Sequence, residues 1–109
     1  MWKRAVQLSI EVYRVTASFP QSEQFGLMNQ MRRASVSIAS NIAEGYGRVT
    51  KGEYPQFLGH ARGSNCELQT QLAIAAALEY GAANAHQLVE TLSADVSRLL
   101  IAIMNKLKA

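Results

Sequence analysis

The run from Met31 to Arg48, MRRASVSIASNIAEGYGR, constrains the fold more than any other part of the chain. Projected as a helix at 100° per residue, the apolar and small side chains in and just before this run sweep roughly 200°, about twice the stripe of an ordinary surface helix. The arc contains Phe25, Leu27, Met28, Met31, Ala34, Ser35, Val36, Ile38, Ala39, Ile42, Ala43 and Tyr46. Because so wide an arc must be covered on more than one side, we expect Ile38 and Ile42, in its middle, to lie in a core.

Apolar periodicity predicts four helices in the 109 residues. They run from Trp2 to Ser18, from about Ser22 to Tyr46, from about Thr50 or Glu53 to Tyr80, and from about Ala85 to Leu107. No segment has the alternation of a strand. Connections of two to five residues force neighbouring helices to run antiparallel. The sequence therefore predicts an all-α protein, a single domain over residues 1–109, with an antiparallel up-down-up-down four-helix bundle.

Local signals support these boundaries. Ser22 is the expected cap of the second helix, with Glu23 in its first turn, and Asn84 is the expected cap of the fourth. Thr50 and Glu53 have the spacing of a capping box before the third helix. Gly81 is expected to end the third helix.

Two stretches resemble a known family: LMNQMRRASVSIASNIAEGYGR and FLGHARGSNCELQTQL. The residues that carry the resemblance are Arg32, Arg33, Ser37, Ile38, Asn41, Ile42, Ala43, Glu44, Gly45, Ala61, Gly63, Ser64, Glu67 and Leu68. The pattern resembles the four-helix-bundle family named for proteins encoded in intervening sequences of bacterial 23S ribosomal RNA genes. The resemblance implies a bundle that assembles as a ring, often of five subunits, with an unsettled role. A related group resembles the accessory proteins of diversity-generating retroelements, which work with a reverse transcriptase and its RNA.

The charge of the chain is mildly basic and uneven. The formal net charge is +3, with seven Lys and Arg against four Asp and Glu in residues 1–54, and four against four in residues 55–109. This excess is far from the dense basic tails typical of nucleic-acid binding. The single cysteine suits a reducing compartment. With no apolar run of membrane-spanning length and no pattern of a signal peptide, we expect a cytoplasmic protein without a membrane partner.

Several polar residues lie near the predicted core. One strip of the second helix carries Arg33, Asn41, Glu44 and Arg48, and Arg62 and Glu67 on the third helix are candidate partners across the hairpin. We interpret Asn41, Glu44, Asn65 and Glu67 as a structural polar network, in which the two asparagines are hydrogen-bonded and fix the helix register. A ligand or phosphate site along the same strip is the alternative.

The sequence gives no support for an enzyme. It lacks a Walker loop, a Cys-x-x-Cys pair, a His-Glu-x-x-His motif and a Gly-x-Ser-x-Gly motif, so no catalytic residue, cofactor or metal is predicted. His86 and Glu90 have metal-ligand spacing, but both are expected on the solvent side of their helix. Cys66 is interpreted as a small buried apolar residue. Gly59 and Gly63 weaken their helix, which suggests that a neighbouring helix passes close to them.

The first two helices have apolar arcs wider than one bundle core requires, whereas the fourth has a single stripe. We therefore expect a subunit interface on the first two helices. The favoured function is a non-enzymatic, ring-forming scaffold, most simply a pentamer.

The alternative is an RNA- or DNA-binding accessory protein, working with a reverse transcriptase. It would use the basic residues Arg32, Arg33, Arg48, Lys51 and Arg62. Arg32 is expected to lie outside the internal contacts, so that its removal spares the fold. Arg33 is the contrasting residue: if it belongs to the internal network, its replacement should reduce stability first and binding only as a consequence.

Overall fold

A computed structural model describes residues 1–47 and 52–108 and contains four long helices. These are α1 (Trp2–Thr16), α2 (Leu27–Tyr46), α3 (Glu53–Ala77) and α4 (Ala83–Lys108), with a short 3-10 helix, η1 (Gln21–Glu23), between α1 and α2. The described residues contain no strand. The prediction of an all-α four-helix bundle is confirmed.

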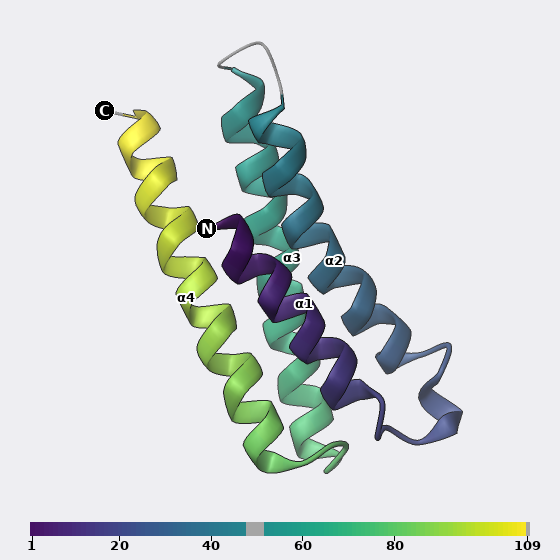
Figure 1. The fold of residues 1–109 in the computed structure, drawn as a ribbon. Helices are drawn as coiled ribbons and strands as arrows, with labels where there is room; N and C mark the ends of the chain where they lie inside the picture. The colour runs from purple at the N-terminus through teal and green to yellow at the C-terminus, as the bar shows by residue number, and fades with distance from the viewer. Residues whose placement is uncertain (48–51, 109) are drawn as a thin grey trace.

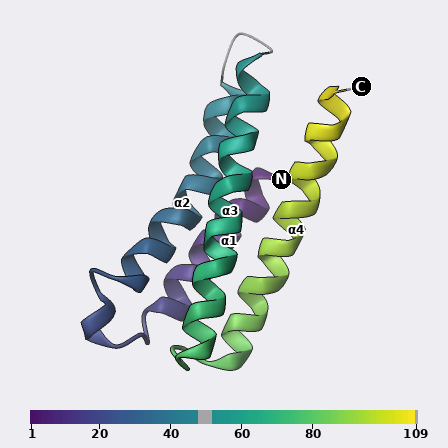
Figure 2. The same cartoon turned by 180° about the vertical axis from the view of Figure 1, so that it is seen from behind.

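The helices pack side by side in an elongated bundle of 44 × 22 × 19 Å. Figure 1 shows that the chain reverses direction at each connection, so each helix runs opposite to the one before it. α1 and α3 each pack against both α2 and α4. Figure 2 shows α3 in front of α1 when the bundle is seen from behind. In the described part of the chain, none of these helices is both long and apolar enough to span a membrane.

All four helices contribute to one apolar core. Its fully buried members include Leu8, Val12, Met31, Ile38, Ile42, Leu58, Leu68, Val89, Val96 and Leu100. Ile38 and Ile42 are therefore core residues, as predicted. Burial of each large side chain of this kind favours folding by about 1.5–3 kcal/mol.

The start of α2 differs from the prediction. The helix begins at Leu27, because Gly26 breaks the helical backbone after η1. Ser22 makes no capping hydrogen bond; instead the Glu23 carboxylate accepts one from the Leu27 N–H (3.0 Å). A Cβ at Gly26 would lie 2.6 Å from that carboxylate oxygen, so glycine leaves the space in which the cap forms. Phe25 lies outside the helix and is 87% exposed, so its expected place in the α2 apolar arc was wrong.

The connection between α3 and α4 also lies earlier in the chain than expected. α3 ends at Ala77, three residues before the predicted end, and Gly81 then adopts φ +82°, a conformation that favours glycine. A Cβ at Gly81 would lie 3.0 Å from the Val15 side chain of α1, so the turn packs directly on that helix. α4 begins at Ala83, which places Asn84 inside its first turn instead of at the cap.

The close approach of α2 and α3 occurs at Gly45. A Cβ there would lie 2.9 Å from the Cβ of Phe57, closer than side chains normally pack. A Cβ at Gly59 or Gly63 would meet no atom within 4 Å, so the expectation that these two glycines admit a neighbouring helix was wrong. Thr50, the first half of the predicted capping box, lies outside the described residues.

Candidate functional site

Helix α1 carries a second apolar row besides the one that enters the core. The core row contains Ala5, Leu8, Val12 and Val15, whereas the second row contains Trp2, Val6, Ile10 and Tyr13. Spacings of three and four residues keep each row on one side of the helix. Trp2, Ile10 and Tyr13 are each 44–49% exposed, so the bundle covers this row only in part.

Helix α2 extends this row. Arg32 packs over the Tyr13 ring, with its guanidinium carbon 4.5 Å from the ring centroid. Val36, one turn further along α2 on the same side, is 42% exposed. We name the surface formed by Trp2, Val6, Ile10, Tyr13 and Val36 the α1–α2 apolar face.

Arg32 is tied to the C-terminal end of α1. Its Nε donates to Thr16 Oγ1 (2.8 Å) and its Nη2 donates to the Tyr13 carbonyl (3.2 Å). A cation at this end of a helix is favoured by the helix dipole. The expectation that Arg32 lies outside the internal contacts was therefore wrong. Its neighbour Arg33, on the strip that was either structural or binding, is exposed. The two arginines are about 100° apart around α2, which is enough to separate their surroundings.

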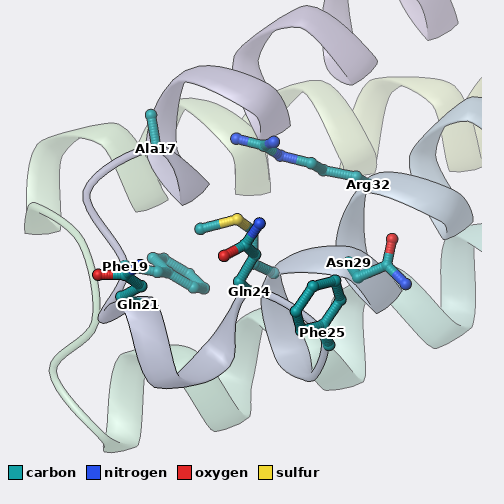
Figure 3. Close-up of a pocket in the computed structure, with 8 residues that line it drawn as sticks. Ala17, Phe19, Gln21, Gln24, Phe25, Asn29 and Arg32 are labelled. Carbon is teal, nitrogen blue, oxygen red and sulfur yellow. The ribbon is translucent and has the colours of Figure 1, made fainter.

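A cavity of about 670 Å³ lies where α1, η1 and α2 meet. It is lined by Ala17, Phe19, Gln21, Gln24, Phe25, Met28, Asn29 and Arg32. Figure 3 shows Arg32 crossing one side of it toward Ala17, and the Phe25 ring on the other. The walls combine neutral amides, apolar side chains and one guanidinium that is already hydrogen-bonded. The lining of this cavity is thus suited to packing against another molecule, and it offers no side chain typical of proton transfer or nucleophilic attack.

Asn41 bonds within its own helix. Its Nδ2 donates to the Ser37 carbonyl (2.8 Å) and to Ser37 Oγ (3.0 Å). Ser37 Oγ is in turn 2.9 Å from Ser64 Oγ on α3. The two serines therefore bridge α2 and α3, and Asn41 supports the bridge from one side. Neither serine was a predicted site residue, because a serine hydroxyl suits a surface as well as an interface.

Asn65 is 2% exposed and bonds across to α4. Its Nδ2 donates to the Ser93 carbonyl (3.0 Å), and Ser93 Oγ donates back to Asn65 Oδ1 (2.7 Å). Gln69 Nε2 also donates to Ser93 Oγ (2.9 Å). All these groups belong to the α3–α4 contact, and the sequence had identified Asn65 but not its partner.

The structure does not gather the other predicted site residues into one cluster. Glu44, Arg62 and Glu67 are exposed. Glu67 accepts a hydrogen bond from Gln71 (3.1 Å) and, with Arg33, lines a shallow hollow beside Ser64. Arg48 and Lys51 lie outside the described residues.

Contacts between the two connections close the end of the bundle opposite the α2–α3 turn. The Tyr80 hydroxyl donates to Glu23 (3.3 Å), and the Tyr80 ring packs on Phe19 with the centroids 5.5 Å apart. Burial, and then the Glu23 carboxylate, raise the pKa of the Tyr80 phenol. His86 donates its Nε2 proton to the Tyr80 carbonyl.

Two expectations about single residues were wrong. His86 is buried, because the turn through Gly81 folds back over it, whereas it had been expected on the solvent side. Cys66 is exposed on α3, whereas it had been expected in the core. Over the described residues, His, Cys, Asp and Glu side chains form no group of three that could hold a metal ion.

A family model for the 23S rRNA-intervening sequence protein matches residues 1–102. The chain belongs to this family. The match covers α1, α2, α3 and most of α4, so both the α1–α2 apolar face and the Asn65–Ser93 contact lie in the region that the family model matches.

One solved structure similar to this chain is a protein of unknown function from the S23 ribosomal protein family of Bacteroides thetaiotaomicron. The two chains are 19% identical, with a TM-score of 0.84 over 94% of this chain and 96% of the other. At this identity the similarity concerns the fold. No curated protein matches the chain.

Proposed function

We propose that this chain is a cytoplasmic, non-enzymatic subunit that assembles with copies of itself into a closed ring through the α1–α2 apolar face. The observation that carries the proposal is the second apolar row of α1, which the bundle leaves about half exposed. The free, exposed thiol of Cys66 supports a reducing compartment.

The size of the face supports stable association. Half-exposed Trp2, Ile10, Tyr13 and Val36, with Phe25 at the adjoining cavity, present several hundred Å² of apolar surface, about the largest patch expected on a monomer. A stable interface removes about 800 Å² per partner, and the flanking side chains of α1 and α2 can supply the rest.

The chemistry of the face favours a second copy of the same chain. The charge next to it belongs to Arg32, which is already bonded to Thr16 and Tyr13 and packs on the Tyr13 ring. A partner therefore needs apolar side chains. A ring of more than two subunits requires the face to pack on a different surface of the next copy, and the exposed leucines of α4, Leu88 and Leu99, provide one. Closed symmetry is the usual outcome for identical subunits. Five subunits is the number that the family resemblance implies.

The test compares two isoleucines that are equally exposed. Ile10 on the face and Ile74 on α3 are both 47% exposed. Light scattering and sedimentation velocity at micromolar concentration should show the wild-type chain as a discrete oligomer. Ile10→Glu should reduce it to smaller species, because a carboxylate would be buried in the interface, whereas Ile74→Glu should leave it intact. A monomeric wild-type chain would overturn the proposal.

Nucleic-acid binding, alone or with a reverse transcriptase, is the alternative function. The exposed guanidinium groups of Arg33 and Arg62 favour it, and a ring would repeat them once per subunit. Labelled single- and double-stranded RNA and DNA should be titrated at about 50 and 200 mM salt with the wild type and Arg33→Ala. Binding that weakens steeply with salt and falls in Arg33→Ala supports the alternative. No binding at the lower salt concentration excludes it for these probes.

A further inference from the structure

We propose that Arg32 is a positioning residue of the assembly surface: it holds the Tyr13 ring in the orientation that a second copy packs against. This inference rests on the proposed self-assembly and adds the residue that organises its interface.

The geometry around Arg32 fixes both the arginine and the ring. Two of its nitrogens bond to α1, one to the Thr16 hydroxyl and one to the Tyr13 carbonyl. Thr16 is itself held, because its Oγ1 donates to the Val12 carbonyl (2.7 Å). With these bonds made, the guanidinium covers the Tyr13 ring at 4.5 Å. The arginine therefore cannot leave the ring without breaking hydrogen bonds at the end of α1.

Tyr13, held in this way, is still 44% exposed as a residue and lies in one row with Val6 and Ile10. Part of the ring faces the guanidinium and the rest is open to a partner. Ordering an interface side chain on association costs about 0.5–1.5 kcal/mol. For Tyr13 and Arg32 much of that ordering is already present in the single subunit, and tyrosine and arginine are the residue types that most often dominate interface energies.

The charge of Arg32 does not prevent its burial in such an interface. The Thr16 hydroxyl, the Tyr13 carbonyl and the negative end of the α1 dipole all face it, and the ring supplies a cation–π contact. Arginine tolerates such sites better than lysine, because its planar group can bond at two nitrogens while it stacks on a ring. Two of the five guanidinium N–H groups are thus bonded within the subunit, and the other three bond to water or to partner carbonyls at the edge of the interface.

The experiment measures the concentration at which the full-length oligomer dissociates, by sedimentation velocity over a dilution series. Arg32→Ala should raise that concentration by about tenfold or more. Arg32→Lys should raise the dissociation concentration by a smaller factor, because lysine keeps the charge but cannot donate from two nitrogens to Thr16 and Tyr13. Arg33→Ala is the matched control: it removes the same charge one residue away and should change the concentration by no more than about twofold.

A double-mutant cycle distinguishes two roles of Arg32: positioning the Tyr13 ring for assembly, or stabilising the fold alone. Tyr13→Leu keeps an apolar side chain but removes the ring. If Arg32 acts through that ring, Arg32→Ala should have little further effect on dissociation in the Tyr13→Leu chain. An equal effect in both backgrounds would mean that Arg32 only secures α1, and would overturn the inference.

Two outcomes distinguish this inference from the proposed function. A wild-type chain that is monomeric over the whole dilution series would overturn both the proposed assembly and the role of Arg32. A wild-type oligomer whose dissociation concentration does not change in Arg32→Ala leaves the assembly standing and overturns the role of Arg32. If Arg32→Ala does not fold, Arg32→Lys and Tyr13→Leu provide the same comparison, and an unchanged dissociation concentration in both overturns the inference.

Discussion

The two helix pairs that include α3 are bridged by polar groups of different kinds. Between α3 and α4, Asn65 and Ser93 exchange two hydrogen bonds at sites that are 2% and 1% exposed. Between α2 and α3, the hydroxyls of Ser37 and Ser64 meet at half-buried sites. Hydrogen bonds between helices are therefore present at a dry site and at a partly hydrated site within one molecule.

This difference indicates how each pair is held in register. A buried donor or acceptor that loses its partner cannot turn to water, so the α3–α4 pair should depend strongly on its asparagine. Water can replace a lost bond at the half-buried serines. The α2–α3 pair should instead depend on apolar contact and on the close approach of the two helices at Gly45. Four substitutions test this contrast, from the largest expected effect to the smallest.

Ile38→Ala tests how much apolar burial on α2 contributes to stability. Ile38 is fully buried, and truncating such a side chain should lower the free energy of unfolding by about 2–5 kcal/mol. Denaturant titration at one fixed protein concentration measures the loss. Ile74→Ala, at a half-exposed site on α3, is the control and should change stability far less. A loss below about 1 kcal/mol for Ile38→Ala would contradict the core described above.

Asn65→Ala tests the dry bridge. It leaves the Ser93 hydroxyl and carbonyl without their asparagine partner in a buried site, and should destabilise the fold by about 1–3 kcal/mol. Ser93→Ala and the double variant complete a thermodynamic cycle, with an expected coupling of about 0.5–3 kcal/mol. Additive losses would show that the two side chains do not act as a pair.

Gly45→Ala tests the close approach of α2 and α3. The new methyl group would lie 2.9 Å from Phe57 Cβ and 3.0 Å from the Tyr54 ring, and such overpacking costs about 1–3 kcal/mol. The gain in helix propensity offsets part of this, so we expect a net loss of about 1 kcal/mol.

Gly59→Ala is the matched control for Gly45→Ala. No atom lies within 4 Å of its added Cβ, so it should stabilise the fold by about 0.5–1 kcal/mol. Thermal unfolding of both variants provides the comparison, and changes of the same sign would contradict it.

Ser64→Ala tests the wet bridge and should have the smallest effect. It removes the hydroxyl contact with Ser37, but water can reach the freed group, so the loss should stay below about 1 kcal/mol. Asn41→Ala should behave similarly, because its amide bonds within its own helix. A loss for Ser64→Ala as large as that for Asn65→Ala would remove the distinction between the two bridges.

Much of the fold could be predicted from the sequence, because periodicity reports burial directly. The positions of Ile38 and Ile42 follow from the centre of one apolar arc. Helix ends were less predictable, since they depend on contacts that are distant in sequence. The α2 start moved to Leu27 because the Glu23 side chain caps it, and Glu23 also accepts a hydrogen bond from Tyr80, which is 57 residues away in the sequence.

The candidate site was harder to predict, because a long side chain can reach several neighbouring groups and the sequence does not specify which one it contacts. Arg32 and Arg33 are adjacent in a helix that the sequence describes well, yet one reaches α1 and the other remains exposed. The Ser37–Ser64 bridge gave a weaker signal, although two small polar residues near the predicted contact of α2 with α3 could have suggested it. His86 was misplaced because a helix projection contains no information about the turn that covers it.

The unequal lengths of the helices bear on the order in which the molecule opens. α1 has 15 residues and five buried positions, whereas α3 has 25 residues and seven, so α1 holds the bundle through fewer contacts. Its amide protons should therefore exchange with solvent sooner than those of α3. Because α1 also carries most of the face proposed for assembly, its exchange should slow as the protein concentration rises, while the α3 amides change less.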